Sequence, residues 1–161
     1  MNVTLKKQTR VKALLILVLN VVLILSTSAV SRAAPSNEGE AEIRAVMQAQ
    51  QDAWNRGDLE GFMKGYARSD AIVFVSGDDV TRGWQTVYDR YKAKYSDRAK
   101  MGKLNFSELE ITSLGADSAL VLGRWELVRQ ADKPHGRFTL LFRRTPEGWR
   151  IVHDHSSAAS P

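Results

Sequence analysis

The sequence predicts an α+β domain in which helices come first and a mainly antiparallel sheet follows. Three observations support this fold class. Apolar residues recur at helical spacing up to about residue 96, they alternate with a period of two from Lys103 onward, and turn-forming segments separate the alternating runs. Long antiparallel strands that follow segregated helices are typical of an α+β layer structure.

Three helices are expected ahead of the alternating region. Asn37, followed three residues later by Glu40, resembles a capping box and opens the first helix, which ends at Gly57. Asp58 is placed to cap a second helix with an apolar face of its own. A third helix is predicted over residues 84–96, where apolar residues follow the spacing i, i+3, i+4, i+7.

The strands are expected as a short hairpin followed by four long strands. The hairpin comprises residues 71–75 and 80–82, which flank a turn rich in glycine and aspartate. The four long strands are predicted over residues 104–113, 118–129, 135–144 and 149–156. Because short turns join them, they are expected to form an antiparallel meander.

The net charge of +5 comes from the N-terminal segment. Five basic residues and no acidic residue precede Ala34, namely Lys6, Lys7, Arg10, Lys12 and Arg32. Without them, 18 basic residues balance 18 acidic ones. A neutral domain has no electrostatic attraction to phosphate backbones, so a nucleic-acid partner is not expected.

The same segment is predicted to be a secretory signal peptide that covers residues 1–33. Its cations precede an apolar run over residues 13–25, and Ser31 and Ala33 occupy the small-residue positions before a cleavage site. The alternative is an uncleaved membrane anchor, although the apolar run is shorter than the ~20 residues that a spanning helix needs. We therefore expect a secreted or periplasmic protein that leaves the membrane after cleavage.

Beyond the leader, residues 34–39 are expected to form a linker, residues 40–157 the folded domain and residues 158–161 a disordered tail. The chain has no cysteine, which excludes disulfides, thiolate metal sites and a cysteine nucleophile. A domain of this size can bury a sufficient core without such cross-links.

Two stretches resemble a known superfamily. They are Trp54 to Gly61 (WNRGDLEG) and Gly148 to Ser157 (GWRIVHDHSS). With the order of the elements, they are similar to the nuclear transport factor 2-like superfamily, which includes SnoaL-like and ketosteroid isomerase-like proteins, over residues 38–157. The second stretch is especially similar to the association domain of calcium/calmodulin-dependent kinases. The resemblance implies a cone-shaped roll, in which one strongly bent sheet wraps around about three N-terminal helices and leaves a cavity at its wide end.

Aromatic residues are plentiful enough to line such a cavity. Each aromatic residue taken singly is better explained as part of the core, because apolar residues at regular spacing indicate the core rather than a ligand site. As a set, however, they indicate a mostly apolar pocket. The candidate ligand-binding aromatic residues are Trp54, Tyr66, Phe74, Trp84, Tyr88, Tyr91, Trp125, Phe138 and Phe142.

The catalytic residues of ketosteroid isomerases are absent from the matching positions of this sequence. Those enzymes use a tyrosine and two aspartates. An alignment on the two motifs puts the corresponding positions at or near Gln50, Val75 and Leu140. Val75 and Leu140 cannot titrate, so steroid isomerisation by that mechanism is not expected, and whether the protein is an enzyme is left open.

Arg124 and Asp154 are the polar candidates for the cavity. In the kinase association domains an arginine at the strand position matching Arg124 faces the cavity, and Asp154 has the parity of the cavity-facing side. A buried guanidinium needs an anionic partner, so an Arg124–Asp154 pair is predicted, with Arg124 holding the anionic group of a ligand. The alternative is a weak surface pair, because one bulge reverses the parity of a strand.

His153 and His155 share the opposite face of the last strand. An imidazole there is a candidate for acid–base chemistry, and we take His153 together with Asp154 as the candidate catalytic residues. Two histidines without a third ligand fall short of a zinc site, so neither a metal nor a cofactor is expected.

Two functions are left open by the sequence. The first is an exported protein that binds a small apolar or aromatic molecule with a polar or anionic group, with weak acid–base activity. The second is a homo-oligomeric assembly module without catalysis, most simply a homodimer. In that module Trp149, Ile151 and His153 would face outward from the sheet into the interface.

Overall fold

The structure is a computed structural model that describes residues 37–159. Its helices are α2 (Asn37–Arg56), α3 (Leu59–Met63), α4 (Trp84–Lys94) and α5 (Arg98–Met101). Its strands are β1 (Val73–Ser76), β2 (Asp79–Arg82), β3 (Lys103–Ser113), β4 (Ser118–Val128), β5 (His135–Thr145) and β6 (Gly148–Ser156).

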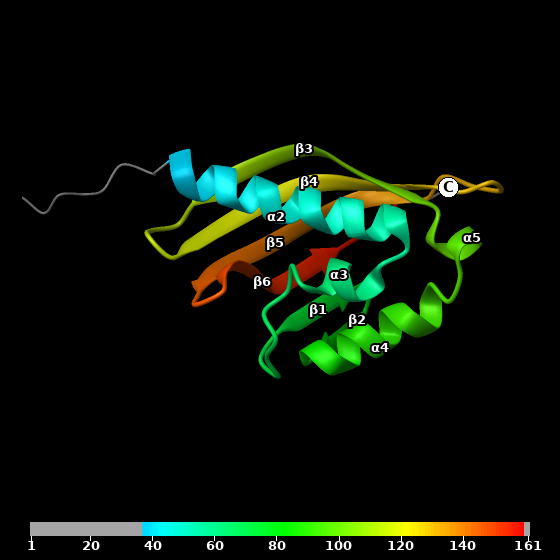
Figure 1. The fold of residues 1–161 in the computed structure, drawn as a ribbon, viewed down its shortest axis with the longest axis horizontal. Coiled ribbons are helices and arrows are strands. Elements are labelled where there is room, and N and C mark those ends of the chain that lie inside the picture. Colours follow the sequence, from blue (N-terminus) through cyan, green and yellow to red (C-terminus); the bar gives the residue numbers. More distant parts are fainter. Residues whose placement is uncertain (1–36, 160–161) are drawn as a thin grey trace, which may run out of the picture. The chain divides into compact units, whose positions relative to one another are not determined.

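The strands form one six-stranded sheet in the order β2-β1-β6-β5-β4-β3. β1 runs parallel to β6, and the other neighbouring pairs are antiparallel. Figure 1 shows α2 crossing one face of the sheet, with α3 and α4 beside β1 and β2. The predicted α+β fold, with N-terminal helices and a curled, mainly antiparallel sheet, is confirmed.

The junction between α2 and α3 follows from two residues. Gly57 has a φ of 82°, in the left-handed region that favours glycine, and it ends α2. Asp58 then caps α3, since its Oδ1 accepts a hydrogen bond of 2.7 Å from the N–H of Gly61. The cap predicted at Asp58 is therefore confirmed, and it turns the chain so that α3 can pack beneath α2.

Some element boundaries differ from the prediction. α2 begins at Asn37, inside the segment expected to be a linker, and α4 ends at Lys94, before the predicted end at residue 96. The short helix α5 was not expected, and its cap is the side chain of Asp97. At the C-terminus, the N–H of Ala159 donates to the carbonyl of His135 at 2.8 Å, so the chain continues along β5 beyond the predicted start of the tail.

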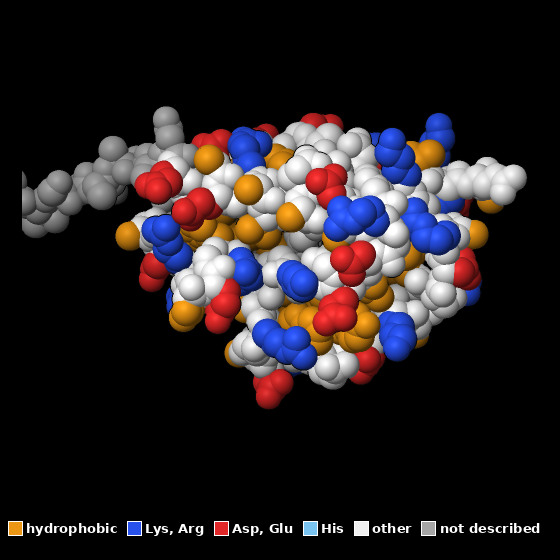
Figure 2. All heavy atoms as spheres, in the orientation of Figure 1, with side chains coloured by type: hydrophobic (Ala, Val, Ile, Leu, Met, Phe, Trp, Pro, Cys, Tyr) orange, Lys and Arg blue, Asp and Glu red, His pale blue; other side chains and the backbone are white. Residues whose placement is uncertain are grey.

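The predicted leader, residues 1–33, lies outside the described residues, so signal peptide, cleavage and export stay predictions. Between residues 37 and 159, no helix is both long and apolar enough to span a membrane. On the face drawn in Figure 2, basic and acidic side chains are interspersed. This face is not the continuous basic surface that binds phosphate backbones.

A bulge in β6 decides which of its residues face the core. Ile151 pairs with Phe142 and His153 pairs with Leu141, which leaves Val152 as the extra residue. Trp149 and Ile151 are only 4% and 1% exposed, so the expectation that they face outward is wrong. The extra residue shifts the alternation by one, and this shift allows Asp154 to point inward as well.

Candidate functional site

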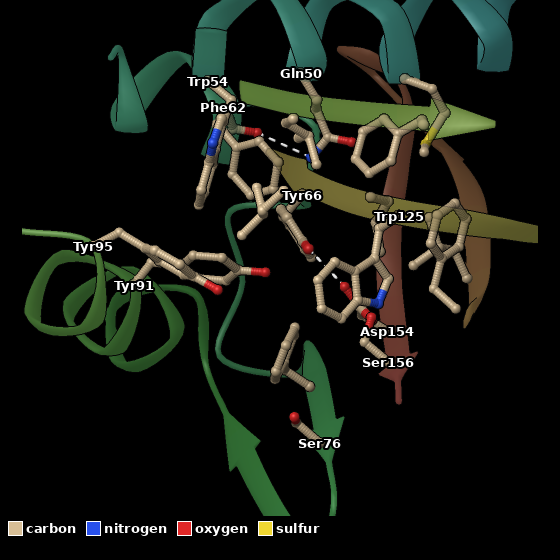
Figure 3. A pocket seen from close by; sticks show the side chains of 18 of the residues that line it. Gln50, Trp54, Phe62, Tyr66, Ser76, Tyr91, Tyr95, Trp125, Asp154 and Ser156 are labelled. Carbon is tan, nitrogen blue, oxygen red and sulfur yellow. Dashed lines mark hydrogen bonds between the residues drawn. The ribbon is translucent and has the colours of Figure 1, made fainter. Parts of the chain in front are cut away.

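A cavity of about 140 Å³ lies between the sheet and helices α2, α3 and α4 (Figure 3). Its aromatic lining residues are Trp54, Phe62, Tyr66, Phe74, Tyr91, Tyr95, Phe106, Trp125 and Phe138. Its polar lining residues are Gln50, Ser76, Lys94, Asp154, Ser156 and Ser157. The walls are therefore mostly apolar, with a small number of polar groups, as is usual for sites that bind small molecules.

Asp154 is the carboxyl group of the cavity. It lies near the middle of the sheet, where its register partners are Phe74 of β1 and Leu140 of β5, and it is 4% exposed. The hydroxyl of Tyr66 donates to Oδ2 at 2.7 Å, and the hydroxyl of Ser156 donates to Oδ1 at 2.7 Å. Both carboxyl oxygens thus have a hydrogen-bond donor, which makes burial of this group tolerable.

The backbone positions Tyr66 opposite Asp154. After α3, the N–H of Ile151 donates to the carbonyl of Gly65 at 2.9 Å, and the N–H of Ala67 donates to the carbonyl of Ile151 at 2.9 Å. These bonds dock the segment that follows α3 onto β6. Figure 3 shows the resulting direction of the Tyr66 side chain, from this segment toward Asp154.

Burial controls the protonation of these groups. It raises the pKa of Asp154 from its ordinary 3.8 to about 6, against the opposing effects of the hydrogen bonds from Tyr66 and Ser156 and of the charge of His155. Burial and the negative charge of Asp154 also raise the pKa values of Tyr66 and Tyr91. Both tyrosines therefore stay neutral hydrogen-bond donors near pH 7, where most Asp154 side chains carry a charge.

The positions aligned with the ketosteroid isomerase residues have other roles. Gln50 lines the cavity, and its Nε2 donates to the carbonyl of Phe62 at 3.0 Å. The amide packs closely against Gly65, where a side chain of any size would collide with it. Leu140 is an apolar wall residue, and Val75 is not among the lining residues. The tyrosine and the carboxyl group of this cavity, Tyr66 and Asp154, therefore lie at other positions than those aligned with the isomerase residues.

The nine predicted aromatic residues divide into two groups. Those that line the cavity are Trp54, Tyr66, Phe74, Tyr91, Trp125 and Phe138. Trp84, Tyr88 and Phe142 do not line it. Trp84 instead stacks on Tyr88, with ring centroids 5.3 Å apart, and donates to the carbonyl of Met63 at 3.2 Å, while Phe142 is fully buried in the core.

The predicted Arg124–Asp154 pair does not form. The inward positions of β4 are the buried alternate residues such as Val121 and Leu127, and Arg124 has the opposite parity. Arg124 lies 3.7 Å from Glu126, another half-buried residue of the same parity, and does not line the cavity. The resemblance placed Arg124 inward, whereas the alternation of apolar residues along β4 favours an outward Arg124.

His153 and His155 also lie away from the cavity walls. His153 is half-buried next to Val73 and Leu141 in the sheet, and His155 is exposed. Among residues 37–159, no group of three or more His, Cys, Asp or Glu side chains is placed to hold a metal ion. Of the two candidate catalytic residues, only Asp154 is therefore in contact with the cavity.

Several lining residues were missed by the sequence reasoning. Lys94 and Tyr95 lie at the end of α4, where a register count cannot tell an exposed residue from one at a cavity entrance. Ser156 was missed although it lies two residues from Asp154 on the same side of a strand, which is the spacing that brings both side chains to one face.

The comparisons with known proteins agree with this geometry. The family model for a SnoaL-like domain matches residues 43–161. The crystal structure of an NTF-2-like protein of unknown function from Shewanella oneidensis MR-1 has 38% sequence identity and a TM-score of 0.71, and the match covers 73% of this chain and 98% of that one. A search among curated proteins found no match.

More distant structures share the fold. A ketosteroid isomerase-like protein from Erwinia carotovora atroseptica has 23% identity and a TM-score of 0.63, over 78% of this chain and 100% of that one. A putative aromatic ring hydroxylase from Novosphingobium aromaticivorans has 16% identity and a TM-score of 0.66, over 80% of this chain and 94% of that one. At these identities the likeness concerns the fold alone, because one fold serves many functions.

Proposed function

Since the chain belongs to the SnoaL-like family of the nuclear transport factor 2-like superfamily, we propose that it binds a small, mostly apolar molecule in the cavity, with a hydrogen-bond donor of that molecule directed at Asp154. The observation that carries this proposal is a buried carboxyl group at the wall of an aromatic cavity.

The size of the cavity supports a ligand of about one ring. Its volume is about 140 Å³. An apolar cavity of about 150 Å³ is large enough to bind benzene. The aromatic walls offer edge and face contacts to such a ring, and the open side lets a longer molecule extend beyond the cavity.

The chemistry of Asp154 supports a second part of the proposal, proton transfer. With a pKa of about 6, the carboxyl group is mostly ionised at pH 7 and is a stronger base than an ordinary aspartate, whose pKa is 3.8. A ligand group with a pKa near or below 6, placed next to Oδ1 or Oδ2, would transfer its proton to this base and keep the negative charge itself. Tyr66, which donates to the same carboxyl, would stabilise the charged form before transfer.

The outer face of the sheet supports a second candidate function, self-association. Leu120 and Leu122 of β4 are 37% and 38% exposed, and they share the outward parity of Arg124. A sheet face with exposed leucines can bury them against a second copy of the chain. Binding in the cavity and association through this face do not exclude each other.

The test of the main proposal compares two probes of similar size, phenol and toluene, which carry a hydroxyl and a methyl group at the same position of the ring. At pH 7.5 we expect phenol to bind at least about tenfold more tightly, because a hydrogen bond to a charged acceptor contributes about 1.5–3 kcal/mol. In Asp154→Asn the preference should fall to about threefold, since the acceptor is then neutral. Titration calorimetry measures both affinities.

The control is Asp78→Asn, which removes an exposed carboxyl in the turn between β1 and β2 and should keep the phenol preference of the unsubstituted protein. Equal binding of phenol and toluene would contradict the role of Asp154. If neither probe binds, the cavity is not a binding site and the proposal fails as a whole.

A further inference from the structure

A second, smaller hollow adjoins the cavity on the side of α4. Its volume is about 40 Å³. Five of its six lining residues also line the main cavity, namely Phe74, Ser76, Tyr91, Lys94 and Tyr95. Figure 3 shows Tyr91 and Tyr95 reaching toward the cavity from the end of α4. The two hollows are therefore parts of one continuous site.

Arg90, which is a cation, lines the smaller hollow but not the main cavity. It lies one helical turn before Lys94, so that both cations project from the same side of α4. The Arg90 guanidinium is held above the ring of Phe74, 5.1 Å from its centroid. Its Nη1 donates to the hydroxyl of Thr81 at 2.9 Å. These contacts fix its position before a ligand arrives.

Acidic side chains only partly neutralise this pair of cations. Nη2 of Arg90 lies 3.7 Å from Oδ2 of Asp79, whose side chain is 80% exposed, so water screens this contact strongly. Within the described residues, no carboxylate lies within 4.0 Å of the Lys94 ammonium. The Lys94 side chain is exposed and its ammonium lies over the ring of Tyr95, 5.5 Å from the centroid.

The site thus has two chemically different ends. The inner end holds the buried carboxyl of Asp154 among aromatic rings, and the outer end holds two cations near solvent. A ligand with an ammonium group would meet the cations on its way in. A ligand with an anionic group would be attracted at the outer end, as long as its inner end is uncharged.

We infer that the ligand is an amphipathic anion, with an apolar body in the cavity and a carboxylate or similar group held between Arg90 and Lys94. This inference rests on the proposed function, because the apolar body must occupy the main cavity. It adds the charge of the ligand and the direction in which the ligand lies.

The test uses three probes with one ring and different ends: 3-phenylpropionate, 3-phenylpropanamide and 3-phenylpropylamine. We expect the carboxylate to bind about tenfold more tightly than the amide at low salt, and the amine to bind most weakly. Lys94→Gln should reduce the preference for the carboxylate about threefold while binding of the amide is unchanged. Added salt should reduce the preference as well.

The control variant is Lys92→Gln, on the same helix, because Lys92 lines neither hollow of the site. It should behave like the unsubstituted protein, apart from effects of net charge that salt removes. Lys94→Gln replaces one exposed ammonium by a neutral amide, and the thermal unfolding of both variants should match that of the unsubstituted protein, which shows that both fold.

Each other outcome overturns a defined part of the account. Equal binding of the carboxylate and the amide, or an unchanged preference in Lys94→Gln, overturns the anion site and leaves the apolar cavity. Tighter binding of the amine would mean that Asp154 sets the charge preference, and it would also overturn the anion site. If none of the three probes binds, both the inference and the proposed function fail.

Discussion

The carboxyl group of Asp154 combines burial with two hydrogen-bond donors, and these act on its pKa in opposite directions. Burial disfavours the charged form, while Tyr66 and Ser156 favour it. Burial is the larger effect, so the pKa rises from 3.8 to about 6. A folded-state pKa above the unfolded value means that the folded protein binds this proton more tightly than the unfolded chain does.

The first consequence concerns stability. Below about pH 3 the carboxyl is mostly protonated in both states, and its ionisation costs the folded state almost nothing. As the pH rises through about 6, the folded state must bury a charge, and the rise from 3.8 to about 6 corresponds to about 3 kcal/mol. Asp154→Asn lacks this charge, so its stability relative to the unsubstituted protein should increase by about 2–3 kcal/mol between pH 4 and pH 7.5.

Urea unfolding of the two proteins across this pH range measures the effect. The comparison cancels the pH dependence that all other groups contribute. Asp78→Asn, in the exposed turn, serves as the reference and should run parallel to the unsubstituted protein. Parallel curves for Asp154→Asn would show that Asp154 keeps an ordinary pKa despite its burial.

At the scale of single elements, β6 shows what the sequence can and cannot predict. The alternation of apolar and polar residues predicted a strand over residues 149–156, and the structure has β6 at Gly148–Ser156. The inward direction of Asp154 came from a resemblance. Nothing in the local sequence marks Val152 as a bulge, because the extra residue is defined only by the pairing of β6 with β5. The directions of Trp149 and Ile151 were mispredicted for that reason.

β4 differs from β6, because the sequence of β4 already indicates which of its residues face the core. Ala119, Val121, Gly123, Trp125 and Leu127 alternate with residues of the other face. Position 123 requires glycine, because a side chain there would collide with the ring of Phe138 in the cavity wall. An outward Arg124 follows from this pattern, and the resemblance alone suggested otherwise.

The outward leucines of β4 allow a test of self-association. If the chain dimerises through this face, the double variant Leu120→Lys and Leu122→Lys should be monomeric, because it would bury two charges in the interface. Lysine at position 122 lies next to Glu110 of β3, a favourable cross-strand pair, so the fold should survive. Sedimentation velocity measures the change in mass.

The matched control for this test is Leu114→Lys, an exposed leucine in the turn between β3 and β4. It should leave the association state unchanged. A double variant that sediments like the unsubstituted protein would exclude this face as the interface.

At the scale of the whole molecule, the site is assembled from elements that are far apart in the sequence. Gln50 and Trp54 come from α2, Tyr66 from the segment after α3, and Asp154 from the last strand. The helices and strands could be predicted because periodicity and turn residues are local signals. The placement of β6 between β1 and β5, including the parallel pair of β1 and β6, depends on tertiary packing, and so does the cavity.

The difference between local signals and tertiary packing also explains which residues of the site could be predicted from the sequence. Most of the large aromatic residues of a small domain lie near its centre, so six of the nine predicted ones line the cavity. Tyr66 could not be predicted as the partner of Asp154, because their hydrogen bond spans 88 residues of sequence. The cations of the outer end lie on an exposed helix, where charged residues are expected for solubility alone.

Direct titration of the Asp154 carboxyl by ¹³C NMR, without and with saturating toluene, tests the central claim that a buried acid borders a cavity open to apolar ligands. We expect a pKa of about 6 for Asp154 in the free protein. With toluene bound we expect a higher pKa, because the ring replaces water that would otherwise stabilise the charged form. A pKa near 4 that toluene does not change would contradict this claim.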